Sequence, residues 1–246
     1  AVTFLSLAAQ QFREIRNIER ETLAKVDADE MIPRGDQYIE GIARAFEARN
    51  FLVMGCTLVL SAVDLWVLDN FPFPLRAGAL AGITLVLFLL LQNVTEGRRL
   101  KELATIREGR VHFIGPNVFV DDIHFMNIGL EQAQAEYLDK AMGLVLEPKS
   151  IDASATLASI GQRQAIVHIC SKLLGIYKDV DTPEFTPIVR RDVKTGKLGL
   201  LIIPATRDLE SLLEAVEKVP VLEGSVARPS KSIAGRERED YQNRTK

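Results

Sequence analysis

The chain has 246 residues, 26% of them charged, and a formal net charge of −3. A large multidomain enzyme does not fit in this length, because a single domain commonly takes about 100 to 200 residues. The nearly balanced charge gives no global basic field, so we expect no nucleic acid as a partner. The mean hydropathy of +0.08 is modest, which indicates that apolar residues are concentrated in one part of the chain.

The first part of the chain, residues 1–49, has the pattern of amphipathic helices. Apolar residues recur every three or four positions from Leu5 to Val26, with charged residues between them. Pro33 and Gly35 interrupt this pattern, and Asp36 is an expected N-cap for a second helix that runs to Arg49. We expect both helices to lie in the cytoplasm.

Residues 50–94 are the most apolar part of the chain and predict a transmembrane hairpin, with spans at about 51–69 and 75–94. The first span carries Asp64 inside its apolar run, and Ala77 to Leu91 carries no charge. A membrane span needs about 17 to 25 mostly apolar residues. The alternative is a pair of core helices in a soluble bundle, but Leu80 to Leu91 has no polar face and the remaining chain is small.

Basic residues near the ends of the spans predict the orientation of the hairpin. They lie before the first span and after the second, whereas the connecting turn holds only Arg76; the flanking residues are Arg34, Arg44, Arg49, Arg98, Arg99, Lys101, Arg107 and Arg110. We therefore expect an integral protein of the cytoplasmic (inner) membrane with both termini in the cytoplasm. Trp66, Phe71 and Phe73 fit an aromatic belt at the far interface.

Residues 95–223 mix both periodicities and predict a cytoplasmic α+β domain. The expected helices are Thr95–Arg110, Gly129–Leu146, Ser154–Tyr177 and Pro204–Val219, the last with Thr206 as its N-cap, and the expected strands are Val111–Ile114, Val118–Val120, Thr186–Arg191 and Leu198–Ile203. Residues 224–246 are polar and predict a disordered tail. Six basic residues against three acidic ones allow this tail either to contact anionic lipid or to stay solvated.

Small residues form two strips within the predicted spans. Gly78 and Gly82 make a Gly-x-x-x-Gly pattern in the second span, and Thr57 and Ser61 make a small polar strip in the first. Small residues allow two helices in a membrane to approach closely, either within the hairpin or between copies. Glycine is also common in membrane helices without such a role.

Asp64 is the one ionisable residue within the first apolar run. An intramembrane carboxylate is often a proton or cation site, and it usually faces protein or water. Arg76 begins the returning helix at a comparable depth, so an ion pair between Asp64 and Arg76, or an Asp64 side chain that reaches the headgroups, is the favoured interpretation.

A weak candidate metal site surrounds the predicted strand pair at His112, Asp122 and His124, with Asp121 beside them. Histidine and carboxylate suit zinc, manganese or non-haem iron, but no complete metal motif is present, so a polar strand edge is the default. His168 and Cys170 lie two apart in a helical pattern and do not face each other. No cofactor motif is complete.

The sequence therefore predicts a non-enzymatic, membrane-anchored subunit that scaffolds or docks a larger membrane protein assembly, such as a secretion, transport or envelope machine. Its expected partners are the lipid bilayer and other membrane subunits or further copies of itself. One alternative is an oligomeric ion- or proton-conducting subunit that uses Asp64. A second is a membrane-anchored, metal-dependent enzyme.

Overall fold

The computed structural model describes residues 2–30, 32–95, 97–176, 187–234 and 237. Its internal contacts divide the chain into two compact units. A helical unit holds Ala1–Leu23 and Ile42–Gly97, and an α+β unit holds Ala24–Gly41 and Arg98–Lys246. The corner between the first two helices therefore belongs to the α+β unit, although the greater part of each helix does not.

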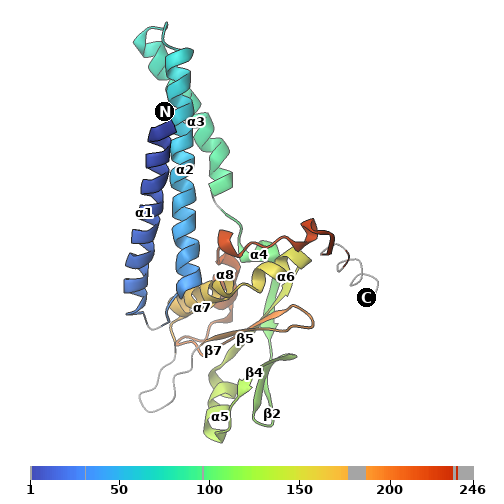
Figure 1. The fold of residues 1–246 in the computed structure, drawn as a ribbon. Coiled ribbons are helices and arrows are strands. Elements are labelled where there is room, and N and C mark those ends of the chain that lie inside the picture. The colour runs from blue at the N-terminus through green and yellow to red at the C-terminus, as the bar shows by residue number, and fades with distance from the viewer. Residues whose placement is uncertain (1, 31, 96, 177–186, 235–236, 238–246) are drawn as a thin grey trace. The chain divides into compact units, whose positions relative to one another are not determined.

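The helical unit contains most of α1 (Val2–Asp27) and α2 (Asp36–Trp66) and all of α3 (Phe73–Thr95), which appear as long ribbons in Figure 1. The predicted second amphipathic helix and the first predicted span form one continuous helix, α2. Helices α2 and α3 form a hairpin, joined by a turn in which the Phe71 amide donates to the Leu68 carbonyl. Both are long and apolar enough to cross a membrane.

The core of the α+β unit is a four-stranded sheet in the order β1-β5-β7-β6, with every described pairing antiparallel. The central strand β5 is buried over most of its length, because helices cover one face of the sheet and a second sheet covers the other. The strands of the larger sheet are β1 (Ala104–Gly109), β5 (Met142–Pro148), β6 (Ile188–Arg191) and β7 (Leu198–Ile202).

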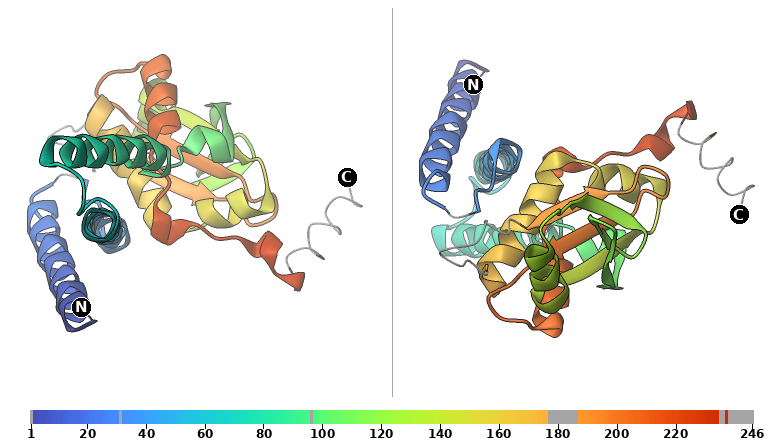
Figure 2. Two further views of the ribbon diagram at one scale, coloured as in Figure 1. Left: turned by 90° about the horizontal axis from the view of Figure 1, so that it is seen from above. Right: turned by 90° about the horizontal axis from the view of Figure 1, so that it is seen from below.

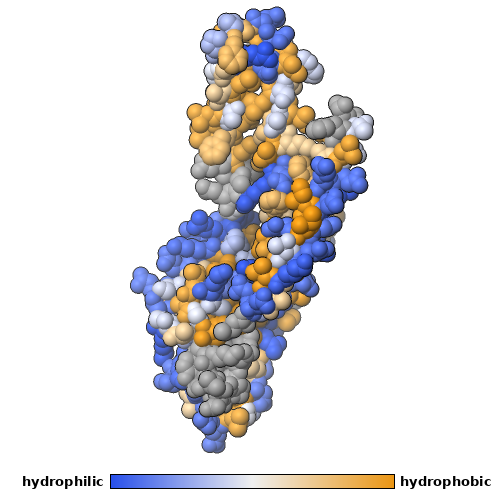
Figure 3. All heavy atoms as spheres, turned by 90° about the vertical axis from the view of Figure 1, so that its left-hand side faces the viewer, coloured by the Kyte–Doolittle hydropathy of each residue, from blue (hydrophilic) through white to orange (hydrophobic). Residues whose placement is uncertain are grey.

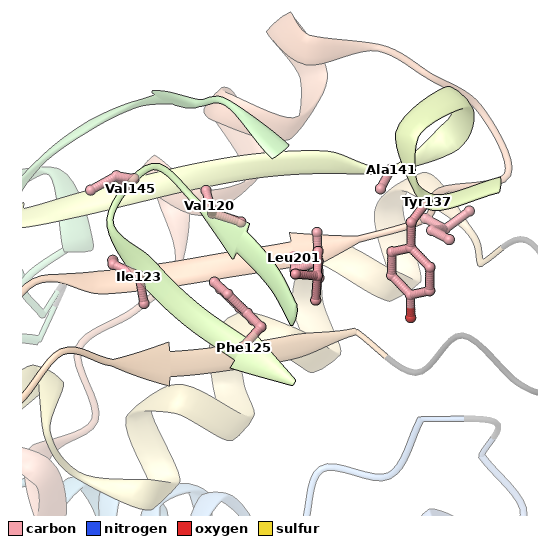
Figure 4. Close-up of a cluster of buried hydrophobic side chains, with 9 residues drawn as sticks. Val120, Ile123, Phe125, Tyr137, Ala141, Val145 and Leu201 are labelled. Carbon is pink, nitrogen blue, oxygen red and sulfur yellow. The ribbon is translucent and has the colours of Figure 1, made fainter. Parts of the chain in front are cut away.

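The second sheet is a three-stranded antiparallel meander of β2 (Val111–Ile114), β3 (Asn117–Val120) and β4 (Ile123–Asn127). An apolar cluster between the two sheets includes Val120, Phe125, Val145 and Leu201, and it also holds Tyr137 from α5 (Glu131–Lys140) (Figure 4). Glycines make this close contact possible. A Cβ added at Gly199 would lie 2.8 Å from Phe125 Cζ, so no larger residue fits without movement.

Helices cover the opposite face of the larger sheet: α6 contacts β5, α7 contacts β6 and α8 contacts β1. Their bounds are α6 (Ile151–Leu157), α7 (Ile160–Leu174) and α8 (Leu209–Lys218), and the short α4 (Leu100–Leu103) packs beside α8. The right-hand view of Figure 2, from below, shows α5 and the smaller sheet in front of the larger one. The α+β unit is thus layered as helices, a sheet and a second sheet.

Two predicted helices prove to be strands in part. The range Thr95–Arg110 is predicted to be one helix, but Thr95 is the last residue of α3, Leu100–Leu103 is the short helix α4, and Ala104–Gly109 is the edge strand β1. The charged residues of β1 face solvent while its backbone pairs with β5. Its polar composition therefore lacks the apolar alternation from which a strand is predicted. The predicted helix Gly129–Leu146 ends at Lys140, and β5 follows. Burial of β5 on both faces removes the alternation that identifies a strand.

The helices predicted over Ser154–Tyr177 and Pro204–Val219 also differ from the structure. The first is divided into α6 and α7 at Ala158 and Ser159, and Tyr177 lies outside the described residues. The second begins at Leu209, with Asp208 rather than Thr206 as its N-cap. The strand prediction for Val111–Ile114 is confirmed by β2. The strands predicted at Thr186–Arg191 and Leu198–Ile203 are confirmed by β6 and β7, although Thr186 lies outside the described residues.

The predicted disordered tail begins instead with two 3₁₀ turns, η1 (Glu223–Ser225) and η2 (Pro229–Lys231). Ser230 donates its backbone N–H to Asp152 Oδ1 at 2.9 Å and its hydroxyl to Asp152 Oδ2 at 2.6 Å. These bonds fix η2 against the start of α6. Most of the tail beyond residue 234 lies outside the described residues.

Candidate functional site

The tip of the hairpin holds an ion pair between its two helices. Arg76 Nη2 donates to Asp64 Oδ2 at 2.6 Å and Arg76 Nε donates to Asp64 Oδ1, so the guanidinium meets both carboxylate oxygens. Arg76 Nη1 also lies 3.5 Å from Asp69 Oδ1. This two-point geometry is the strongest arrangement available to arginine and carboxylate. Asp64 and Arg76 thus neutralise each other within the chain.

The small-residue strips lie on the outside of the hairpin. A Cβ added at Gly78 or Gly82 would meet no atom within 4 Å, apart from the helix's own backbone, and Thr57 and Ser61 are exposed. The half-buried positions of α3 recur instead at the larger residues Leu80, Ile83, Leu87 and Leu91. The side of α3 that contains Leu80, Ile83 and Leu87 is therefore its less exposed side, and the glycine face is left open.

The candidate metal residues do not converge. His112 and His124 pair with opposite sides of Phe119 across the smaller sheet, with ring centroids 5.6 and 5.2 Å from that phenyl ring. The Phe119 ring therefore lies between the two imidazole rings, so the two histidines do not face a common ion. Asp122 is exposed in the following turn. No metal-binding group of three such residues occurs within the described chain.

Asp121 has a different role, which the sequence did not indicate. It has a positive φ of 49°, accepts the Arg110 N–H at 2.8 Å and accepts from Arg107 Nη1 at 2.6 Å. Arg107 also donates to Glu147 Oε1 at 3.2 Å, and Lys197 Nζ donates to the same oxygen at 2.8 Å. These four charged side chains form a network that links the turn of the smaller sheet to β1, β5 and the β6–β7 loop.

The network shifts the ionisation of its members. The Lys197 hydrogen bond, together with Arg107, holds the pKa of Glu147 below its usual value. Partial burial raises the pKa of Asp121, but the bonds from Arg107 and the Arg110 amide outweigh that effect and leave the pKa lowered. Since every carboxylate in the network has a basic partner, its geometry is that of a structural clamp rather than a catalytic acid–base pair.

His168 and Cys170 are both buried in α7 and do not form a catalytic pair. His168 Nδ1 lies 2.8 Å from the Ile32 carbonyl oxygen, to which its N–H donates, and the ring lies edge-on to Tyr38. Burial raises the pKa of Cys170 to about 12, so its thiol stays protonated and unreactive at neutral pH.

His168 contacts the segment of residues 24–41, which is called the corner below. Its packing against the α+β unit is not indicated by the sequence. Asp27 accepts the backbone N–H groups of Arg34 at 2.6 Å and Gly35 at 3.0 Å, which closes the turn between α1 and α2. Gln37 Oε1 then accepts the Gly161 N–H at the start of α7 at 3.1 Å. The corner is thereby built into the α+β unit.

Known proteins resemble this chain over most of its length. The family described as YIEGIA protein matches residues 1–232. The chain belongs to the YIEGIA family. The letters of the family's description also stand in this chain as Tyr38-Ile39-Glu40-Gly41-Ile42-Ala43. The chain is similar to the uncharacterized protein YphB of Bacillus subtilis (strain 168), with 38% identity over 238 residues, which is 97% of this chain and 77% of YphB. No solved structure gives a significant match.

The six residues that spell the family description form the first turns of α2. Tyr38 and Ile39 are buried, and an added Cβ at Gly41 would already touch the Leu222 side chain at 3.4 Å. Burial raises the pKa of Tyr38 above its ordinary value. In this YIEGIA protein the segment is thus a packing surface, through which the start of α2 is fixed to the α+β unit.

Proposed function

We propose that this YIEGIA protein is a non-enzymatic, membrane-anchored subunit that docks a larger membrane protein assembly. In this proposal, the hairpin of α2 and α3 spans the bilayer, and the α+β unit remains on the cytoplasmic side as the docking module. The corner at residues 24–41 belongs to the α+β unit, and α2 continues from it into the hairpin.

The exposure of the hairpin carries this proposal. None of the most apolar 18-residue window of either candidate helix is buried, whereas a core helix of a soluble protein is mostly buried. Trp66 is 87% exposed and Phe88 is 63% exposed. Figure 3 shows mainly apolar colouring over the hairpin at the top of the view. A contiguous apolar surface of this kind is costly in water and favourable in lipid.

Length and charge support the same placement. The 19 residues of Phe73–Leu91 extend about 28 Å at 1.5 Å per residue, close to the roughly 30 Å hydrocarbon core. Basic residues lie on the side of the chain ends, at Arg44, Arg49, Arg98 and Arg99. The turn has Arg76 alone, and Asp64 neutralises it. The positive-inside tendency therefore supports a cytoplasmic α+β unit.

Exposed apolar residues on the α+β unit support a docking role. Ile114 is at the end of β2, Leu130 precedes α5 and Leu138 lies on α5, which contacts β2. All three are exposed large aliphatic side chains in one part of the unit. Together with the absence of a converging catalytic group among the described residues, they favour recognition of another protein over chemistry.

Two measurements test the proposal. Membranes containing the full chain should retain it during extraction with alkaline carbonate, and a variant in which residues 51–94 are replaced by a flexible linker should be released. Release of the full chain would contradict membrane insertion. Mild detergent extraction, followed by identification of the co-purifying chains, should return a defined larger complex. Recovery of a lone monomer would contradict the docking role while leaving the anchor intact.

A further inference from the structure

Helix α1 lies alongside α2 in a register that two contacts define. Phe12 packs edge-on against Phe51 with ring centroids 5.3 Å apart, and Arg16 Nη1 donates to Glu47 Oε2 at 2.9 Å. One turn further along α1 therefore corresponds to one turn back along α2, so the helices are antiparallel. Figures 1 and 2 both show α1 beside α2. At this register Leu5 lies level with Leu58, which is well inside the first apolar span.

The charges on the two helices end at the same level. Residues 2–12 of α1 contain no ionisable side chain, whereas residues 13–27 contain eight. On α2 the last charge before the apolar run is Arg49. In the register set by Phe12 and Phe51, Arg13 of α1 lies level with Asn50 of α2. The charged segments of both helices therefore end at one level. In α1 the charged residues follow this level along the chain, and in α2 they precede it.

The uncharged part of α1 has one side turned to α2 and another side without a described contact in this chain. Leu5, Ala8 and Ala9 are half-buried, as expected for the side facing α2. Leu7 is 57% exposed on the other side, which it shares with the exposed, uncharged side chains of Thr3, Gln10 and Gln11. An apolar side chain beside a membrane span, above the last charge of its own helix, is suited to contact with acyl chains rather than water.

We infer that residues 2–12 of α1 enter the bilayer beside α2 and contact lipid hydrocarbon through the face that contains Leu7. This inference rests on the proposed membrane insertion of the hairpin. Eleven helical residues extend about 16 Å, roughly half of the hydrocarbon core. The membrane part of the described chain is then a hairpin and a third, partial helix, and α1 lies in the cytoplasm only from about Arg13 onward.

Site-directed spin labelling of the full chain in phosphatidylcholine–phosphatidylglycerol vesicles tests the inference. The labels are placed one at a time in a Cys56→Ala background, since Cys170 is fully buried. Leu7→Cys and Ile18→Cys form a matched pair, because both positions lie on α1 and both are 57% exposed. Phe88→Cys in α3 is the reference for the hairpin.

Collision rates with oxygen, which dissolves in lipid, and with chromium oxalate, which is charged and stays in water, are then compared. We expect the oxygen-to-oxalate ratio at position 7 to match that at position 88 and to exceed that at position 18 by about tenfold or more. A ratio at 7 equal to that at 18, with 88 still in lipid, would overturn this inference and leave the anchor standing. Low collision rates with both reagents at 7 would mean that protein covers the site and would also overturn it. Water exposure at 88 would remove both proposals.

Discussion

Individual side chains in this protein act mainly through hydrogen bonds to backbone and to opposite charges. Asp27 closes the corner between α1 and α2, Asp121 bonds the Arg110 amide, and Asp208 accepts the Glu210 and Ser211 N–H groups at 3.0 and 3.2 Å. Each carboxylate satisfies donors that would otherwise lack a partner. The sequence contains each of these aspartates, but it does not reveal which donors they meet.

Helix α8 allows a direct comparison of two capping candidates. Asp208→Ala removes the acceptor for two amides at the start of the helix and should lower the Tm by about 2 to 4 °C. Thr206→Ala, at the position that the sequence favoured, should leave the Tm unchanged. Thermal unfolding followed by circular dichroism measures both variants. The reverse order of effects would mean that α8 begins earlier than described.

The network around Glu147 predicts a dependence of stability on pH. Because the folded state lowers the pKa of Glu147, its contribution is fully present above the unfolded value of about 4.3 and is lost as the pH falls through the folded value. Glu147→Gln should therefore reduce stability near pH 7 by at most about 1 kcal/mol, since the pair is partly exposed. The difference from the wild-type chain should shrink toward pH 3. A difference that grows in acid would contradict this assignment.

At the scale of elements, the two sheets pack closely because glycines occupy the facing positions. A Cβ at Gly143 would lie 2.7 Å from the Gly109 carbonyl oxygen and 2.7 Å from Val120 Cγ1, so it meets backbone as well as a side chain. The smaller sheet then rests directly on β5. No periodicity in the sequence indicates this contact, because it joins residues from separate strands.

Gly143→Ala should consequently destabilise the α+β unit by about 1 to 3 kcal/mol through overpacking. Gly129→Ala is the matched control, since an added Cβ there meets no atom within 4 Å. Chemical denaturation followed by fluorescence of a label on the smaller sheet compares the two. Equal effects of both substitutions would show that glycine flexibility, rather than space between the sheets, determines the loss.

Across the whole molecule, the α+β unit is incomplete without the corner at residues 24–41. Ile39 is only 2% exposed, and Gln37 contacts the first turn of α7. A fragment that begins at Arg98 should therefore be less stable than one in which residues 24–50 are joined by a flexible linker to residue 95. Burial of Ile39 alone contributes about 1.5 to 3 kcal/mol.

Differential scanning calorimetry of the two fragments measures this gain. An Ile39→Ala change in the linked fragment should remove much of the gain, because a buried isoleucine replaced by alanine typically costs about 2 to 5 kcal/mol. Phe46→Ala, at an exposed position of the same helix, serves as the control. Equal Tm values for the short and linked fragments would contradict the inclusion of the corner in the unit.

The sequence by itself determined the long apolar hairpin, the preceding amphipathic helix and the mixed α+β character of the rest. Runs such as Leu80–Leu91 and the three- and four-residue spacing of α1 are local, and local patterns survive without knowledge of the fold. The Asp64–Arg76 contact was also within reach, because a turn of known length brings the two ends of a hairpin together.

Only the tertiary structure decided that Ala104–Gly109 and Met142–Pro148 are strands, that Asp121 joins an ionic network rather than a metal site, and that His112 and His124 lie on opposite sides of Phe119. It alone gave the alignment of α1 with α2, in which the charged residues of both helices end at one level. These features depend on contacts between segments that are distant in the chain. Burial on both faces or pairing at an edge overrides the propensity of each segment, and no single stretch of sequence contains that information.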